Sequence, residues 1–297
     1  MDEFAFGVLT NIALFSFLAL SAYLLLIAGE MSFGQQAFFG VGAYAAGIGT
    51  AMWGWPLPLA AAFAMALGAG AAWLVGLPTI RLRGLYFAMA TLAAAEMFRI
   101  LFELLHYRRE IDGDLVGPDG TQGFRGIRWV LERGFEPHEF LALVTAILAL
   151  VLAGFALVAR SRLGARIRMV GEDPELAAVF GVDVARLKLG VVAAAGALAA
   201  LGGALYAHHN TYIEPRNFDI MLGVHSLAYG LIGGLGTAAG PLLGVLIDIG
   251  LLESLRVFQG WRMVVFGGLV AVLLIVRPRG LLDEAVVNRV KRALSTR

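Results

Sequence analysis

Long apolar stretches recur along almost the whole chain, and the charged residues collect in the segments between them. A helix needs about 20 apolar residues to cross a bilayer core roughly 30 Å thick. Stretches that approach this length lie at 4–28, 31–52, 57–78, 84–105, 138–158, 185–207, 222–238, 241–258 and 261–276. The second and seventh are short or interrupted by glycines, so either could be re-entrant. The pattern predicts an all-α fold, a polytopic membrane helix bundle of about 8–9 transmembrane or re-entrant helices.

The composition agrees with a membrane protein. Hydrophobic residues make up 59% of the 297 positions and charged residues only 15%, whereas a soluble domain carries roughly 25% charge. We therefore expect one transmembrane domain over residues 1–297, with a cytoplasmic segment at 159–185 and no separate soluble domain. No Lys or Arg precedes Arg81, so the first stretch is expected to be a retained span rather than a cleaved signal peptide.

The distribution of basic residues predicts the orientation. Positive charge is in excess in the turn 79–83, in the segment 159–189 and in the tail after Val276. Segments of this kind stay in the cytoplasm. Loops 106–137 and 208–221 have no cationic excess and are expected on the periplasmic side. Nine crossings with the N-terminus outside satisfy these assignments, and an eight-span version would place the N-terminus inside.

Glycines point to a break near the end of the chain. Gly236, Gly240 and Gly244 follow at intervals of four, a spacing that lets helices approach closely. Pro241 interrupts this run, so a helix break is expected near Gly240 and Pro241. Broken, glycine-rich segments often mark the pathway of a transporter. Tight helix packing alone explains the glycines equally well.

A few charged residues fall inside the predicted spans. Glu96, Arg99 and Glu103 share one face of a helix, and we expect a structural ion pair there rather than a proton relay. His225, Asp248 and Glu253 are interpreted as lying singly. The histidines show no metal-ligand spacing, and no lysine follows a glycine as a phosphate loop requires. No catalytic residue, cofactor, metal site or nucleic-acid partner is predicted.

The segment 171–181 is predicted to be a short helix, with sequence signals for its start and for its end. Asp173 suits the N-cap, Pro174 the first helical position, Glu175 the positive end of the helix dipole, and Gly181 the C-terminal end. A rigid helix on the cytoplasmic side could dock on a partner and transmit force. An ordinary structured loop is the alternative that these residues leave open.

Several motifs resemble one family. They are SFGQQAFFGVGAY at 32–44, RLRGLYFAMATL at 81–92, SRLGARIR at 161–168, GGLGTAAGP at 233–241 and RPRGL at 277–281. From about residue 20 to residue 282 the chain resembles the M-type permease of hydrophobic, or branched-chain, amino-acid ABC importers. The resemblance implies a bacterial inner-membrane protein that pairs with a second, H-type permease. It also implies two ATPase subunits and a periplasmic substrate-binding protein as partners.

The resemblance further implies that 172–181 is a short cytoplasmic coupling helix that contacts an ATPase. The residues given this role are Glu172, Asp173, Pro174, Glu175, Leu176, Ala177, Ala178, Phe180 and Gly181. Leu176, Val179 and Phe180 are expected to form its apolar side, and Ala177 and Ala178 to keep its backbone accessible.

Two further groups of residues are assigned. Two adjacent glutamines in an apolar segment need partners that lipid cannot offer. We therefore expect a translocation-pathway group to face a second permease rather than lipid: Gln35, Gln36, Phe38, Phe39 and Tyr44. In the loop 208–221, Glu214 and Arg216 are candidates for contact with the binding protein, and a solvated turn is the alternative.

The substrate stays open at this point. Importers for urea, amides or aromatic acids use similar permeases, so branched-chain or related amino acids are one choice among several. A stand-alone secondary transporter and a membrane scaffold without transport activity are the competing functions.

Overall fold

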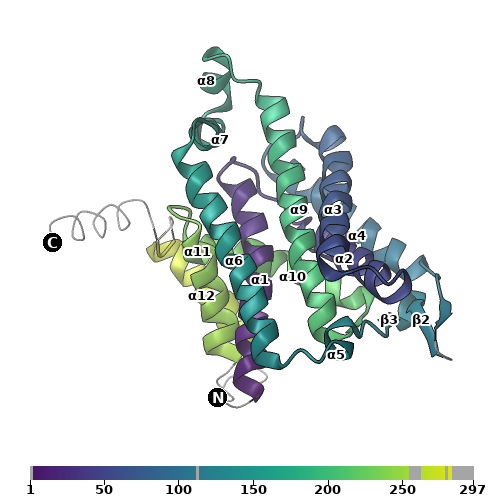
Figure 1. Ribbon diagram of the computed structural model, residues 1–297. Helices are drawn as coiled ribbons and strands as arrows, with labels where there is room; N and C mark the ends of the chain where they lie inside the picture. The colour runs from purple at the N-terminus through teal and green to yellow at the C-terminus, as the bar shows by residue number, and fades with distance from the viewer. Residues whose placement is uncertain (1–2, 112–113, 254–261, 278–279, 283–297) are drawn as a thin grey trace.

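The computed structural model describes residues 3–111, 114–253, 262–277 and 280–282. Five helices in these ranges are long and apolar enough to cross a membrane. They are α1 (Glu3–Leu26), α3 (Leu57–Thr79), α4 (Leu85–Leu104), α6 (Pro137–Arg160) and α9 (Val184–Asn210). Figure 1 shows these helices running along one another as a bundle. The predicted all-α membrane fold is confirmed.

Shorter helices fill the remaining apolar segments. They are α2 (Gln35–Gly47) with the π-helical turn η1 (Ile48–Met52), α10 (Ile220–Gly233), α11 (Ala239–Val245) with the π-helical turn η4 (Leu246–Glu253), and α12 (Arg262–Val276). Each of the nine predicted segments thus contains a helix. α10 has 14 residues, which is about 21 Å of helix and shorter than a bilayer core. It corresponds to the seventh segment, which the sequence marks as short.

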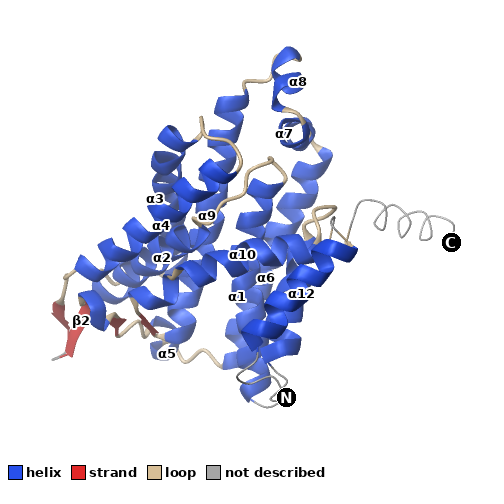
Figure 2. Ribbon diagram, turned by 180° about the vertical axis from the view of Figure 1, so that it is seen from behind, coloured by secondary structure: helices blue, strands red, loops and turns tan. Residues whose placement is uncertain are grey.

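The connections carry their own structure, which the sequence did not predict. Residues 106–137 contain the strands β1 (Arg109–Ile111), β2 (Asp114–Pro118) and β3 (Phe124–Arg125), the turn η2 (Gly120–Gln122) and the helix α5 (Trp129–Glu132). Between α9 and α10 lie β4 (Tyr212–Ile213) and the turn η3 (Pro215–Phe218). The strands form one antiparallel sheet in the order β1-β2-β3-β4. In the described part of the chain, Figure 2 shows strands at one end of the bundle only.

The sheet and one ion pair show which of the connecting segments lie at the same end of the bundle, as the predicted membrane orientation requires. Pairing of β3 with β4 joins the two loops that were both expected on the periplasmic side. At the opposite end lie α7 (Arg162–Glu172) and α8 (Pro174–Val179). There Arg83 of the turn 79–83 pairs with Glu175 at 3.3 Å, so two segments expected in the cytoplasm share one end. The first turns of α1 lie at the sheet end (Figure 1), as the nine-crossing version expects.

α9 lies at the centre of the bundle and packs on α1, α2 and α3. The contact with α2 is backbone against backbone. A Cβ atom on Gly203 would lie 1.8 Å from the carbonyl oxygen of Phe39, and one on Gly42 would lie 2.0 Å from that of Ala200. Glycine at both positions therefore sets the distance between α2 and α9.

The expected helix break is confirmed, but it comes earlier in the chain. α10 ends at Gly233 and α11 begins at Ala239, so the break occupies 234–238. Pro241 lies in the first turn of α11, where its missing N–H group removes no hydrogen bond. Gly236 falls in the break itself, so the three glycines do not share one helix face. Gly240 instead packs on the backbone of Gly233 and Gly234.

Candidate functional site

The end of the bundle that carries α7 and α8 is the most distinctive surface. In Figure 1, α8 lies beyond the other helices, and α7 connects it to the end of α6. The sequence did not predict α7, although the hydroxyl of Ser161 caps it by accepting from the Gly164 N–H at 3.3 Å. In α8 the predicted cap is confirmed, because Asp173 Oδ1 accepts from the N–H groups of Glu175 and Leu176, each at 3.0 Å. Pro174 is the first residue of the helix, as expected.

α8 presents an apolar side to solvent. Val179 is 83% exposed, Phe180 70% and Leu176 49%. Ala178 is exposed, but Ala177 is fully buried, so the expectation that Ala177 keeps the backbone accessible is wrong. Ala177 is the residue through which α8 packs against the rest of the protein. Because large apolar side chains gathered at an exposed tip mark interaction sites, α8 is a candidate docking surface for another protein.

The other residues assigned to this segment lie around that tip. Glu172, Asp173 and Glu175 are exposed and Pro174 is half-buried. Gly181 is exposed and ends the helix with a φ of +79°, as its predicted C-terminal place requires.

The loop after α1 supports this end of the molecule. Gly29 in the loop has a φ of +79°, and a Cβ atom there would lie 2.8 Å from the carbonyl oxygen of Gly171. A Cβ atom on Gly171 would in turn lie 2.3 Å from the carbonyl oxygen of Ile27. The last turn of α7, directly before the cap of α8, therefore rests on the loop without any side chain between the two backbones.

A buried ion pair joins the same loop to α9. Lys188 Nζ donates to Glu30 Oε1, and the two residues are 9% and 3% exposed. The second carboxylate oxygen of Glu30 is buried and has no hydrogen-bond partner among the described residues. Sequence reasoning missed this pair. The available signal was that Glu30 is the one acidic residue between Glu3 and Glu96, at the end of an apolar span.

Gln35 lies at the centre of a small polar cluster between helices. Its Nε2 donates to the hydroxyl of Ser32 at 3.3 Å, and its Oε1 accepts from the hydroxyl of Ser21 on α1. The Ser21 oxygen also lies 2.7 Å from the carbonyl oxygen of Ala195 on α9. This cluster links α1, α2 and α9.

Gln36 and Tyr44 are buried without such partners. Neither the amide of Gln36 nor the hydroxyl of Tyr44 has a hydrogen-bond partner in the described part of the chain. The Gln36 amide lies against Gly223 of α10, where a Cβ atom would come within 2.3 Å of Gln36 Oε1. The ring of Tyr44 stacks on Phe102 at 4.6 Å.

The remaining pathway candidates pack into the same core. Phe38 lies edge to face with Phe98, and Phe39 contacts Tyr206 at 5.4 Å between ring centres. With the two glutamines and Tyr44, all five candidates are at most 3% exposed. The structure places them inside this chain, not on a surface that a second permease could contact. A role in the pathway stays a prediction.

Two charged groups inside the bundle have partners. Arg99 pairs with Glu96 and Glu103, as expected. The interpretation of His225 and Asp248 as isolated residues is wrong. His225 Nε2 lies 4.0 Å from Asp248 Oδ2, and the hydroxyl of Tyr229 donates to the same oxygen at 2.8 Å. The side chain of Glu253 lies outside the described part of the structure.

At the sheet end, Glu214 and Arg216 occupy different settings. Glu214 is half-buried, and its Oε2 accepts from the hydroxyl of Tyr212 at 3.3 Å. Partial burial and the nearby Glu214 carboxylate raise the pKa of Tyr212. Arg216 is exposed. Glu214 is the N-cap of the turn η3 and Arg216 lies within it. Among the described residues, the Arg216 side chain has no ion pair or hydrogen bond that would compete with a partner.

Comparison with known proteins finds a matching family and several similar permeases. Residues 4–276 match the family described as branched-chain amino acid transport system, permease component. The chain is 29% identical, over 86% of its length, to the high-affinity branched-chain amino acid transport system permease protein LivM of Escherichia coli. It is 28% identical to the LivM protein of Salmonella typhimurium over the same share. It spans 64% of the length of each of these relatives.

Other permeases match over shorter stretches. The ribose import permease protein RbsC of Bacillus subtilis is 33% identical over 63% of this chain and 58% of its own length. No solved structure matches. Since the family match runs through nearly all the described helices, this multi-pass membrane protein belongs to the family of permease components of branched-chain amino acid transport systems.

Proposed function

We propose that this chain is one permease subunit of an ABC importer in the bacterial inner membrane. With a second, H-type permease it forms the translocation pathway for branched-chain or related amino acids. Two separate ATPase subunits supply the energy, and a periplasmic substrate-binding protein delivers the substrate. The whole chain acts as one transmembrane unit and does not itself catalyse a reaction. Family membership and the LivM relatives support this proposal.

The observation that carries the coupling role is the exposed apolar side of α8. The helix is capped at its start, rests on buried Ala177, and leaves Val179 and Phe180 largely uncovered. An isolated six-residue helix is not stable in water, so its caps and its seat hold it in place. In the proposal an ATPase covers the exposed side, and 159–185 transmits its movement to the spans.

Reconstitution tests the proposal directly. The chain is co-expressed with its neighbouring subunits, and the complex is placed in proteoliposomes with ATP inside. We expect ATP hydrolysis and uptake that both depend on the loaded binding protein. Branched-chain amino acids, urea, amides, aromatic acids and ribose are compared as substrates. Uptake of a non-amino-acid only would reject the substrate class, and uptake without any ATPase subunit would reject the importer.

A stand-alone carrier is the second candidate, and one observation favours it. His225, Tyr229 and Asp248 meet in a buried cluster between α10 and η4, an arrangement that proton-coupled carriers use. In that case Asp248→Asn would abolish uptake driven by a proton gradient in liposomes that contain this chain alone. Unchanged ATP-driven uptake by the complex with Asp248→Asn would reject a proton-transfer role.

A further inference from the structure

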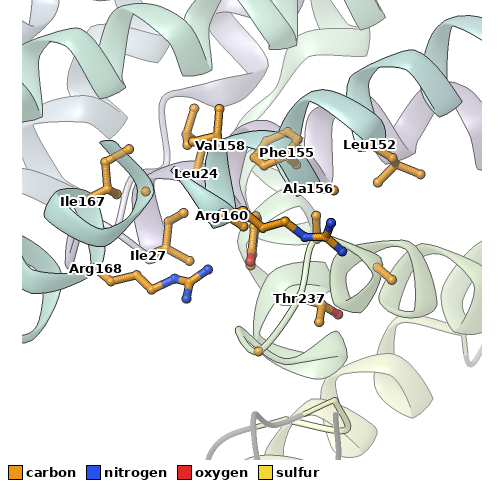
Figure 3. Close-up of a pocket in the computed structure, with 16 residues that line it drawn as sticks. Leu24, Ile27, Leu152, Phe155, Ala156, Val158, Arg160, Ile167, Arg168 and Thr237 are labelled. Atoms are coloured by element: carbon orange, nitrogen blue, oxygen red, sulfur yellow. The ribbon is translucent and has the colours of Figure 1, made fainter. Parts of the chain in front are cut away.

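A cavity of about 610 Å³ opens where α6 passes into α7 (Figure 3). Its walls come from the last turns of α1 and α6, from α7, and from the break between α10 and α11. Leu24, Ile27, Phe155 and Ile167 make the interior largely apolar, and Thr237 borders it from the break. This size falls in the range of small-molecule sites, roughly 300 to 1,000 Å³. None of the residues that line it is acidic.

Two arginines border this cavity. Arg160 is the last residue of α6, and Arg168 lies two turns along α7. Figure 3 shows both guanidinium groups beside the space between α6, α7 and the segment that carries Thr237. No described carboxylate lies within ion-pair distance of either one, whereas Arg83, Arg99 and Arg186 each have such a partner. The cavity therefore combines an apolar interior with an uncompensated double positive charge.

The depth of the cavity in the membrane follows from α6. This helix has 24 residues and is apolar enough to span the bilayer, so Arg160 marks the level where the span meets the headgroups. Ala156 and Ala159, which line the cavity on α6, are themselves exposed, so the cavity opens to the outside of the bundle along this span. Acyl chains thus reach the apolar interior from the side, and phosphates reach the arginines at headgroup level.

We propose that this cavity binds one anionic phospholipid of the surrounding bilayer. The phosphate lies between Arg160 and Arg168, and one acyl chain occupies the space between α1 and α6. Basic pockets between helices on the cytoplasmic side are suited to anionic headgroups. Two unpaired cations favour a lipid with net negative charge over a zwitterionic one of the same size. This site does not depend on which substrate the protein transports.

Native mass spectrometry of the full-length protein in detergent tests the site. Phosphatidylglycerol and phosphatidylcholine with identical acyl chains are added in turn. We expect phosphatidylglycerol to be retained and phosphatidylcholine to be lost. Replacement of both arginines, R160Q with R168Q, should weaken phosphatidylglycerol binding about 30-fold, or about fivefold for each arginine at an anionic surface.

Two further variants separate this site from general surface charge and from free anions. The pair R162Q and R166Q removes the same charge from α7 at positions that do not line the cavity, and it should bind like the unmodified protein. Ala156→Trp fills the cavity but keeps both arginines, and it should lose the lipid. Glycerol phosphate, which has no acyl chain, should not displace phosphatidylglycerol.

Thermal unfolding without added lipid checks that each variant is folded. The proposal is overturned if R160Q with R168Q binds phosphatidylglycerol as tightly as the unmodified protein, or if R162Q with R166Q loses as much binding. Retention of the lipid by Ala156→Trp, or displacement by glycerol phosphate, would show that free anions or surface charge explain the binding instead.

Discussion

Lys188 of α9 and Glu30 of the loop after α1 form a buried ion pair beneath the end of the bundle that carries α8. The two residues are 158 positions apart in sequence. The pair fixes the loop to the second turn of α9, while Gly29 in the same loop supports α7. The segment proposed to move with an ATPase is thus held to both α1 and α9.

Loss of one partner in this pair should destabilise the protein strongly. Lys188→Met leaves the Glu30 carboxylate buried without its cation, which is expected to lower the free energy of unfolding by about 3–5 kcal/mol. Lys188→Met combined with Glu30→Gln removes both charges and should recover much of the loss. Thermal unfolding in detergent, followed by fluorescence-detected gel filtration, measures both. A double variant no more stable than the single one would contradict a role for the pair itself.

Substitutions on the exposed side of α8 should uncouple the complex. Ala178→Asp places a charge where the proposed ATPase contact would bury it, and Phe180→Ala removes the aromatic side chain exposed at the end of the helix. ATP hydrolysis by the reconstituted complex should no longer respond to the binding protein, while the chain still folds and inserts. Ala165→Asp makes the same change on an exposed position of α7 and should have no effect. Normal uptake with both α8 substitutions combined would reject the coupling role.

The packing of α2 on α9 should be sensitive to a single methyl group. Gly203→Ala places a Cβ atom against the Phe39 carbonyl oxygen, and such overpacking is expected to destabilise by about 1–3 kcal/mol. Gly190→Ala is the matched control in the same helix, because no atom lies within 4 Å of its Cβ position. It should leave stability unchanged or raise it by about 0.5–1 kcal/mol. Equal changes in the melting temperature of the two variants would show that α2 and α9 do not pack tightly at Gly203.

The orientation can be tested by labelling, since the chain contains no cysteine. Ala165→Cys on α7 should react in intact cells only with a membrane-permeant thiol reagent. Arg216→Cys at the sheet end should react with an impermeant one. Both positions are exposed, so access to the reagent depends on the side of the membrane. Reversal of the two results would overturn the assignment of both ends.

The turn η3 should show a salt-dependent effect if it contacts the binding protein. Charge reversal of Glu214 and Arg216 should lower stimulation of ATP hydrolysis by the binding protein at low salt. The deficit should shrink as the ionic strength rises, because screening weakens pairs between exposed charges. A deficit that persists or grows at high salt would exclude direct ion pairing at this turn.

The sequence predicted the elements that depend on local pattern. Apolar length located the spans, and the cap at Asp173 located the start of α8, because both signals lie within a few neighbouring residues. The pairing of Arg99 with Glu96 and Glu103 was also predictable, since a helix brings these positions together within two turns.

The features that the sequence left unresolved depend on contacts between distant segments. No neighbouring residue in the sequence indicates that Glu30 pairs with Lys188. The same holds for Asp248 and its contacts with His225 and Tyr229. The burial of Gln35 and Gln36 inside this chain follows from how closely α9 and α10 approach α2. Polarity alone requires that the amides avoid lipid, and it does not distinguish a site within one chain from an interface between two.

The pairing of β3 with β4 has a consequence for how this protein can change over evolutionary time. The bonds that hold Phe124 to Ile213 and Arg125 to Tyr212 run between main-chain atoms, and main-chain bonds form with almost any side chain. Substitutions at the exposed positions of these two loops can therefore alter the chemistry of this end of the bundle while the backbone keeps its shape. In the proposed importer, the same framework would accept a different binding protein without a change of backbone.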